Sequence, residues 1–407
     1  MASRAVTFAN ARGEQLAATL DLPVNGQPRG YALFAHCFTC GKDLKALHHI
    51  SRALTARGIA VLRFDFTGLG ASEGEFAATT FSSNIDDLVA AARHLEAEYA
   101  APQILVGHSL GGTAVLAAAH RLPSVRAVST IGAPSDAAHV ISHFEEHRAT
   151  IKQEGEAEVD LGGRPFRIRK ALLDDLAEQR VHDAIHRLGR ALLIFHSPVD
   201  RTVAIDHAAR IYQAALHPKS FVSLDRADHL LSAEADAEYI GVVTAAWASK
   251  YVDALAPSRR DEDAGEARVL VRIGAQGYVS DIDAGGHPLV ADEPVALGGS
   301  DQGPSPYQLL NAALGACTAM TLRMYAERKQ LPLQGVLVRL EHAKVHARDC
   351  ADCPQENARV DVIERVITLE GDLDAGQRQR LLEIADRCPV HRTLHEPVLV
   401  RSRLADD

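Results

Sequence analysis

The five residues from Gly107 to Gly111, which read Gly-His-Ser-Leu-Gly, constrain the fold of this chain more than any other stretch. The apolar run 104–106 precedes them and the alanine-rich stretch 113–120 follows, which predicts a strand, a sharp turn and a helix. Glycine on either side of the serine leaves out side chains that so tight a turn cannot accommodate. Amides at the start of the helix point toward the Ser109 hydroxyl. We therefore expect Ser109 to be a nucleophile and the Leu110 N–H to be an oxyanion donor; the alternative is a glycine-rich turn with an incidental serine.

An acid and a histidine follow Ser109 in the chain, each just after an apolar run. The run 191–195 predicts a buried strand that leads to Asp200, and the run 220–224 leads into a loop that carries His229. Two rival acids, Asp225 and Asp228, lie on the loop of the histidine itself, where a turn or capping role is more usual. We expect His229 to move the Ser109 proton while Asp200 orients and stabilises the imidazole.

The order nucleophile, acid, histidine resembles that of α/β hydrolases. Expected strands and helices alternate before residue 252, which predicts a mostly parallel sheet with helices on both faces. The strands are expected at 15–22, 30–36, 59–66, 103–107, 126–132, 191–196 and 220–224, and the helices near 43–57, 79–98, 109–121, 205–216 and 232–250.

The family resemblance extends to two further segments. Residues 36–40 read His-Cys-Phe-Thr-Cys and resemble the His-Gly-Phe oxyanion loop of α/β hydrolases, with Cys37 in place of glycine. This resemblance implies that the Phe38 N–H is the second oxyanion donor. Residues 134–190 interrupt the alternation where the family carries a lid, with a polar helix over 137–150 and a hairpin over 157–168.

Size and charge narrow the class of protein. A chain of 407 residues is too long for one ordinary core, which suggests two domains. Its net charge of −10 argues against nucleic acid as a partner. It has no signal-like apolar start and no stretch of membrane-spanning length, so we expect a cytoplasmic protein. Disulfides are then not expected among its six cysteines, and Cys37 and Cys40 are expected to be structural thiols rather than a redox pair.

Composition locates the boundary between the domains. All 11 phenylalanines fall between Phe8 and Phe221, whereas four of the six cysteines follow residue 300. The polar, aperiodic stretch 253–266 separates the two regions and predicts a linker. We therefore expect domains at 1–252 and 267–407.

Two cysteines stand out in the second domain. A helix is expected from about 305 to 329, and its stretch 309–320 is apolar nearly all round, which is typical of a central, buried helix. Cys317 lies within it, with Met320 and Met324 along the same face. Cys388 precedes a proline that suits the first position of a helix, so this thiol is expected to cap a helix.

This pattern resembles the OsmC/Ohr family of thiol-dependent hydroperoxide reductases over essentially all of 267–407. The resemblance rests on the Gly-Pro-Ser-Pro sequence at 303–306, the alanine-rich helix with Cys317, and the Cys388-Pro motif. It implies an α+β fold and an intertwined homodimer with sites at the subunit interface. It also implies that Cys317 attacks the peroxide, that Cys388 forms a disulfide with it, and that a dithiol reductant reopens the disulfide.

One position departs from the family pattern. Its peroxidase members have a glutamate ten positions before the first cysteine, which orients an activating arginine, and this chain has Tyr307 there. No activating arginine can be assigned in 267–303, although Arg268 and Arg272 are available. The resemblance therefore implies the fold, whereas the glutamate and arginine that activate the thiol in the peroxidase members are not matched in this sequence.

A further Cys-x-x-Cys pair, Cys350 and Cys353, follows His342 and His346. Four such ligands could hold zinc, but the spacing fits no common zinc module, and a thiol pair in a solvent-exposed loop is favoured. No metal or cofactor is expected.

We therefore expect a serine-dependent ester or thioester hydrolase joined to a reductase of organic hydroperoxides. The alternative is a hydrolase whose second domain only binds and dimerises. A weaker alternative keeps the hydrolase fold and triad but performs cofactor-free haloperoxidase chemistry.

Overall fold

The computed structural model describes residues 2–24, 26–36, 41–161, 163–255, 269–275, 277–346 and 359–404. The chain divides into two units, one comprising Met1–Gly274 with Asp281–Leu289 and the other Ala275–Ser280 with Val290–Asp407. The expected linker starts with a single 3-10 turn, η5 (Asp253–Leu255), and its remaining residues lie outside the described part of the chain.

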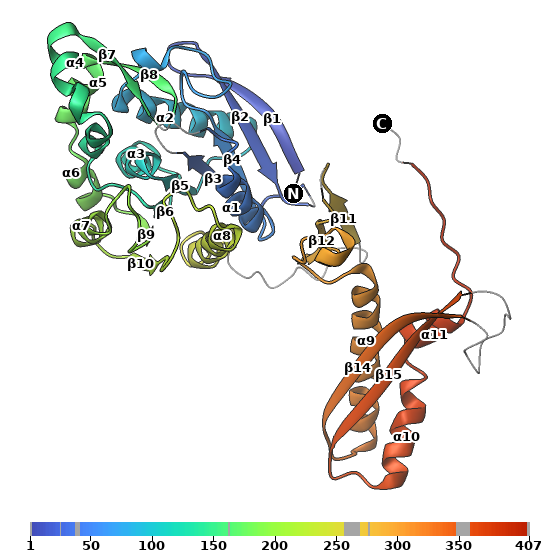
Figure 1. Ribbon diagram of the computed structural model, residues 1–407. Coiled ribbons are helices and arrows are strands. Elements are labelled where there is room, and N and C mark those ends of the chain that lie inside the picture. Colours follow the sequence, from blue (N-terminus) through green and yellow to red (C-terminus); the bar gives the residue numbers. More distant parts are fainter. Residues whose placement is uncertain are drawn as a thin grey trace. The chain divides into compact units, whose positions relative to one another are not determined.

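An eight-stranded sheet forms the centre of the first unit, in the order β1-β2-β4-β3-β5-β6-β9-β10 (Figure 1). Its strands are β1 (Ala2–Ala9), β2 (Gln15–Leu22), β3 (Gly30–Ala35), β4 (Ile59–Phe64), β5 (Ile104–His108), β6 (Ala127–Ile131), β9 (Ala191–His196) and β10 (Lys219–Ser223). The pairs β1–β2 and β2–β4 are antiparallel and all the others are parallel. The expected mostly parallel sheet is confirmed, and β1 is an additional edge strand.

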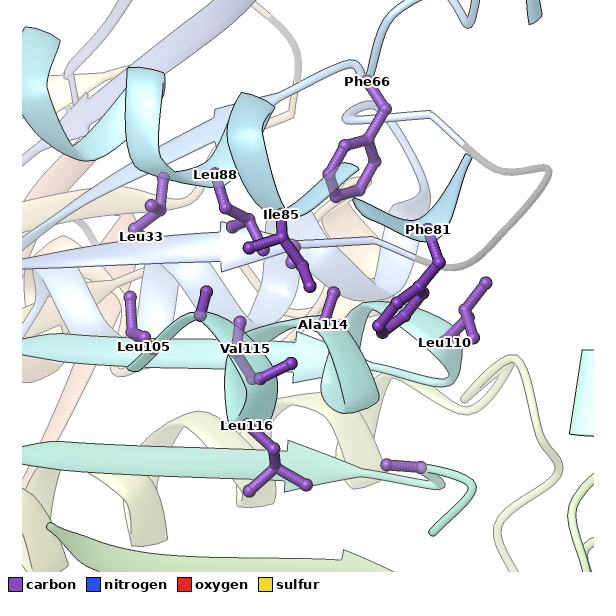
Figure 2. Close-up of a cluster of buried hydrophobic side chains, with 14 of the residues drawn as sticks. Leu33, Phe66, Phe81, Ile85, Leu88, Leu105, Leu110, Ala114, Val115 and Leu116 are labelled. Atoms are coloured by element: carbon purple, nitrogen blue, oxygen red, sulfur yellow. The ribbon is translucent and has the colours of Figure 1, made fainter. Parts of the chain in front are cut away.

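Helices cover both faces of this sheet. Helices α1 (Lys45–Thr55) and α8 (Glu234–Ala248) pack on one face, and α2 (Phe81–Glu98), α3 (Leu110–Ala118) and α7 (Asp206–Ala214) pack on the other. Strand β9 is buried throughout, and alternate side chains of β9 enter opposite cores: Leu192 and Ile194 join the α2–α3 core, whereas Leu193 and Phe195 join the α1–α8 core. Figure 2 shows part of the α2–α3 core. This packing places the carboxyl ends of β5, β6 and β9 at one edge, where ligands of such sheets bind.

The insertion between β6 and β9 contains the expected hairpin, β7 (Glu156–Asp160) with β8 (Pro165–Arg169). The expected single helix over 137–150 is wrong. The chain forms two 3-10 segments, η3 (Ala137–His143) and η4 (Glu145–His147), and α4 begins only at Arg148 and ends at Glu154. The break falls at Phe144, whose side chain is buried and whose φ of −143° is not helical. Burial of this aromatic ring therefore outweighs helical continuity. Two short helices, α5 (Lys170–Glu178) and α6 (Val181–His186), complete the insertion.

After residue 268, the described chain forms two small groups of strands and three helices. Strands β11 (Val269–Ile273), β12 (Ser280–Ala284) and β13 (His287–Ala291) form one sheet, and β14 (Leu333–His346) pairs with β15 (Arg359–Gly371) in a long hairpin. The helices are α9 (Pro306–Lys329), α10 (Ala375–Ala385) and α11 (Pro389–His395), with a 3-10 turn η6 (Val295–Leu297). Ser305 caps α9 through a capping box with Gln308, which explains why the helix begins at Pro306.

The expectation that α9 is buried is wrong for this single chain. Only one stripe of the helix is buried, at Leu314, Gly315, Thr318, Leu322 and Ala326. Leu310, Met320 and Met324 are 36%, 65% and 70% exposed. The hydrophobic cluster on this side of α9 has seven buried residues in the described part of the chain, and two of them, Leu322 and Ala326, belong to the helix itself, so it is too small to surround a helix of 24 residues. No helix in the described part of the chain is long and apolar enough to cross a membrane.

Candidate functional sites

The turn between β5 and α3 has the strained backbone that its sequence predicts. Ser109 has φ 54° and ψ −127°, in the left-handed half of the φ range that residues other than glycine rarely adopt. Its own N–H donates to the Ile131 carbonyl at 2.8 Å, which ties the turn to β6. A Cβ at Gly107 would collide with the Gly111 carbonyl, and a Cβ at Gly111 would collide with the carbonyls of Ala35 and His36. Both glycines are therefore required by close backbone packing.

Ser109, His229 and Asp200 form a continuous hydrogen-bonded chain. The Ser109 Oγ lies 3.0 Å from His229 Nε2, and His229 Nδ1 lies 2.8 Å from Asp200 Oδ2. An ionised carboxylate only accepts, so Nδ1 carries the proton and Nε2 is left to accept from the serine hydroxyl. This arrangement allows the imidazole to remove a proton from Ser109.

The Asp200 carboxylate is fixed by backbone amides as well as by the imidazole. Its Oδ1 accepts from the N–H groups of Thr202 at 2.8 Å and Val203 at 2.9 Å. Burial would raise the pKa of Asp200, but the hydrogen bonds from His229 and the two amides outweigh burial and hold this pKa below its ordinary value. Asp200 is therefore ionised at neutral pH.

The rival acids serve other partners. Asp225 accepts from the Ser223 hydroxyl at 2.9 Å, and Asp228 accepts from the Ser232 N–H at 3.0 Å. Both bonds are local turn interactions.

His108 is a residue near the triad that sequence reasoning missed. Its ring is buried, lies 5.1 Å from the His229 ring, and donates from Nε2 to the His229 carbonyl at 2.7 Å. Its Nδ1 has no hydrogen-bond partner within the described residues. Burial and the neighbouring His229 lower the pKa of His108 to about 4, so the ring is neutral at physiological pH. The signal was its place directly before Ser109.

Of the two expected oxyanion donors, Leu110 lies within the described residues and Phe38 does not. Leu110 is the first residue of α3, so no carbonyl within the helix can accept from its N–H. Phe38, Cys37 and Cys40 lie outside the described residues. The segment that follows them is anchored by the buried Asp65, which accepts from the Lys42 N–H at 2.7 Å and from Lys42 Nζ at 2.9 Å.

A second group of histidines surrounds the start of the insertion. His207 Nδ1 lies 3.1 Å from the Ser135 N–H and 3.0 Å from its hydroxyl. The ring of His139, from η3, packs edge-on against His207 with ring centres 4.6 Å apart. Burial and this neighbour lower the pKa of His207 to about 4. These rings connect the insertion to α7.

The thiols of the second unit lie in different surroundings. Both Cys317 and Cys388 are free; Cys317 is half-buried and Cys388 is fully buried. As expected, Cys388 caps α11, and its Sγ accepts from the His391 N–H at 3.3 Å. Its second neighbour is the Thr318 hydroxyl at 3.7 Å, from the residue next to Cys317.

An arginine that sequence reasoning missed approaches this pair. Arg365, on β15, donates to Thr318 Oγ1 at 3.0 Å, to the Ala385 carbonyl at 3.3 Å and to Asp386 Oδ1 at 2.6 Å. Its position, 23 residues before Cys388, carried no sequence signal because the hairpin brings it there. Of the arginines considered earlier, Arg272 is exposed on β11 and Arg268 lies outside the described residues.

Tyr307 occupies the position of the family glutamate and has a packing role. Its ring stacks on His342 at 4.0 Å between ring centres, with Lys344 Nζ 5.8 Å from the Tyr307 ring centre. His342 also bonds to Asp361 at 2.8 Å. Cys350 and Cys353 lie outside the described residues, as does the side chain of His346. Within the residues that are described, no group of three or more potential ligands is arranged to hold a metal ion.

Comparisons with known proteins match two different families to two separate segments of the chain. Residues 26–153 match the family described as Serine aminopeptidase, S33, and residues 299–403 match the family described as OsmC-like protein. The crystal structure of an esterase domain from a Rhodothermus marinus protein is 57% identical, covers 62% of this chain and all of that chain, and has a TM-score of 0.53. The chain belongs to the α/β hydrolases and carries a C-terminal OsmC-like domain.

More distant relatives share the hydrolase part. The mitochondrial palmitoyl-protein thioesterase ABHD10 of Rattus norvegicus is 27% identical over 48% of this chain and 61% of its own length. The chain therefore spans about three fifths of that relative. The mouse α/β hydrolase domain-containing protein 10 structure is 20% identical over 61% of this chain and 99% of its own, with a TM-score of 0.51, and it shows the fold alone. The α/β-hydrolase unit is thus related to esterases and to a thioesterase.

Proposed function

We propose that the α/β-hydrolase unit cleaves acyl esters or thioesters with Ser109 as nucleophile. The hydrogen-bonded chain from Asp200 through His229 to the strained Ser109 carries this proposal. The names of the relatives, an esterase domain and a palmitoyl-protein thioesterase, support this choice of substrate class.

The reaction would follow from the positions of these groups. His229 Nε2 takes the Ser109 proton as Oγ attacks the acyl carbon, and the Leu110 N–H stabilises the oxyanion. The same imidazole returns the proton to the leaving alcohol or thiol, and the acyl-enzyme remains. Water then attacks the acyl-enzyme with His229 again as base, which releases the acid and restores Ser109.

Covalent labelling tests this nucleophile. The wild-type protein should react with a fluorophosphonate probe and hydrolyse p-nitrophenyl esters or an acyl thioester, and Ser109→Ala should do neither. The exposed Ser232, on the histidine loop, provides a matched control, because Ser232→Ala should label as the wild type does. Labelling that persists in Ser109→Ala would overturn the assignment.

For the OsmC-like unit we propose reduction of organic hydroperoxides, with Cys317 attacking and Cys388 resolving. Cys317 is half-buried and so accessible in part, whereas Cys388 is fully buried, which suits a thiol that reacts only with its partner cysteine. A dithiol would then reduce the disulfide, and a reducing compartment such as the cytoplasm suits that cycle. The unit is proposed to form a homodimer, because α9 leaves Met320 and Met324 uncovered.

A second candidate is a binding and dimerisation unit without peroxidase chemistry. The stacking of Tyr307 on His342, where peroxidase relatives have glutamate, favours it. Cumene hydroperoxide separates the two: a peroxidase should form a Cys317–Cys388 disulfide and consume dithiol, and a binding unit should do neither.

A further inference from the structure

Arg365 is held in one orientation by two consecutive residues at the C-terminal end of α10, just before Cys388. Its guanidinium is mostly buried and bonds to the carbonyl of Ala385, at the end of α10, and to the carboxylate of Asp386. The carbonyl end of a helix and a carboxylate both attract a cation. The third contact, to Thr318 Oγ1 at 3.0 Å, is therefore made by a group that cannot easily turn away.

This contact decides which way the Thr318 hydroxyl points. Arginine has only donors, so it occupies a lone pair of Thr318 Oγ1 and leaves the hydroxyl proton available. The Cys388 Sγ lies 3.7 Å from that oxygen. A Cys388 thiolate has no proton to donate, so in that state the sulfur accepts from the Thr318 O–H in addition to the His391 N–H at 3.3 Å. Both donors stabilise negative charge on sulfur in a site closed to water.

We propose that Arg365 is a positioning residue that acts through the Thr318 hydroxyl to prepare Cys388 for attack on oxidised Cys317. The inference rests on the proposed hydroperoxide reductase function, and it assigns the arginine to the resolving thiol rather than to the peroxide-attacking one.

The reaction balances without further reagents until the final reduction. The Cys317 thiolate bonds to the terminal, hydrogen-bearing peroxide oxygen, the O–O bond breaks, and the departing alkoxide takes up the proton that Cys317 lost, which gives the alcohol. Cys317 is now a sulfenic acid. The Cys388 thiolate attacks its sulfur, the S–O bond breaks, and the departing hydroxide takes up the proton that Cys388 lost, which gives water. An external dithiol then reduces the disulfide.

The test uses the full-length protein and follows the two steps separately by peptide-resolved mass spectrometry. The variants are Thr318→Val, which keeps the side-chain shape without the hydroxyl, and Arg365→Lys, which keeps the charge without the fork. Arg323→Lys is the matched control, because Arg323 lies on α9 as Thr318 does, but it donates to the carbonyls of Leu333 and Gln334. Circular dichroism checks that each variant is folded.

We expect cumene hydroperoxide to oxidise Cys317 at the wild-type rate in all three variants. In Thr318→Val and Arg365→Lys, disulfide formation should slow at least tenfold, dimedone should trap more Cys317 sulfenic acid, and excess peroxide should carry it to the sulfinic acid. The rate of disulfide formation increases with pH as Cys388 loses its proton, and in these two variants this increase should occur at a higher pH than in the wild type. A purely structural role would not shift this pH profile. Arg323→Lys should behave as the wild type does.

Two results would overturn the inference while leaving the proposed peroxidase function in place. Disulfide formation at the wild-type rate in Thr318→Val would show that the hydroxyl is not needed, even if Arg365→Lys failed to fold. Equal slowing in Arg323→Lys would show a general loss of packing. A wild-type protein whose Cys317 is never oxidised would instead refute the proposed peroxidase function, and the inference with it.

Discussion

At the scale of single residues, the hydrolase site depends on how the two carboxylate oxygens of Asp200 divide their hydrogen bonds. Asp200 uses Oδ1 for the amides of Thr202 and Val203 and Oδ2 for His229. Each oxygen thus has a separate role, one in holding the loop and one in orienting the imidazole.

This division predicts the effect of Asp200→Asn. The two amides will retain the carbonyl oxygen, so the amide NH₂ will face His229 Nδ1 and force the other imidazole tautomer. We expect kcat for ester hydrolysis to fall roughly 10³- to 10⁴-fold with little change in KM, as removal of this acid does in other triads. Asp228→Asn is the matched control and should retain most of the activity. Similar losses in both variants would contradict the assignment of the acid.

His108 predicts a pH dependence of stability. The folded protein keeps this ring neutral down to a pKa of about 4, whereas the unfolded chain binds a proton near 6.5. Between these values the unfolded state binds more protons, so stability is complete above the upper value and is lost as the pH falls toward the lower one. The contribution is up to about 3 kcal/mol of unfolding free energy.

Urea unfolding at pH 7.5, 5.5 and 4.5 measures this contribution. His108→Gln, which can still donate to the His229 carbonyl, should be less sensitive to acid than the wild type. The exposed His120 gives a control, since His120→Gln should keep the full loss. Equal acid sensitivity in the wild type and His108→Gln would argue against the burial of a neutral ring.

At the scale of elements, the junction of β5 and α3 is held by close backbone contact. Gly111 approaches the carbonyls at the end of β3, so the turn that exposes Ser109 also fixes its distance from the neighbouring strand. The end of β3 therefore leaves no room for a side chain at position 111 of α3.

Gly111→Ala tests this limit. The added Cβ meets the carbonyls of Ala35 and His36, so the helix or the strand end must move. We expect a loss of about 1–3 kcal/mol in unfolding free energy, as for overpacked sites, together with loss of esterase activity. Gly274→Ala is the control, because its Cβ would meet nothing within 4 Å and its φ is not in the left-handed range. Wild-type activity in Gly111→Ala would show that the junction is looser than described.

At the scale of the whole molecule, the two units differ in how well they cover their apolar surface. The hydrolase unit buries two large clusters on either side of its sheet, whereas the core around Leu322 and Leu381 contains seven residues. The second unit leaves much of its longest helix exposed, as expected for a subunit that dimerises.

We therefore expect charges on this helix to prevent dimer formation. Met320→Glu combined with Met324→Glu should convert a dimer to a monomer in size-exclusion chromatography with light scattering. The control, Met320→Leu with Met324→Leu, should remain dimeric. Esterase activity should survive in both, because the Ser109 site lies entirely in the other unit. A wild-type protein that is monomeric at micromolar concentration would contradict the proposed homodimer.

The sequence alone determined the features that depend on local order along the chain. Alternating apolar runs predicted the mostly parallel sheet, the glycines around Ser109 predicted its turn, and loop positions predicted Asp200 and His229. These signals are local because strand periodicity, turn geometry and capping each involve only neighbouring residues.

Only the tertiary structure decided which distant groups meet. His108 beside the His229 carbonyl and Arg365 beside Thr318 are contacts across 121 and 47 positions, which no local pattern encodes. The broken helix at Phe144 and the uncovered face of α9 have the same origin. At Phe144, burial of the ring outweighed the helix that the local sequence favours. At α9, the folded chain offers too small a core to bury the apolar helix that the local sequence predicts. Both outcomes depend on residues far away in the sequence.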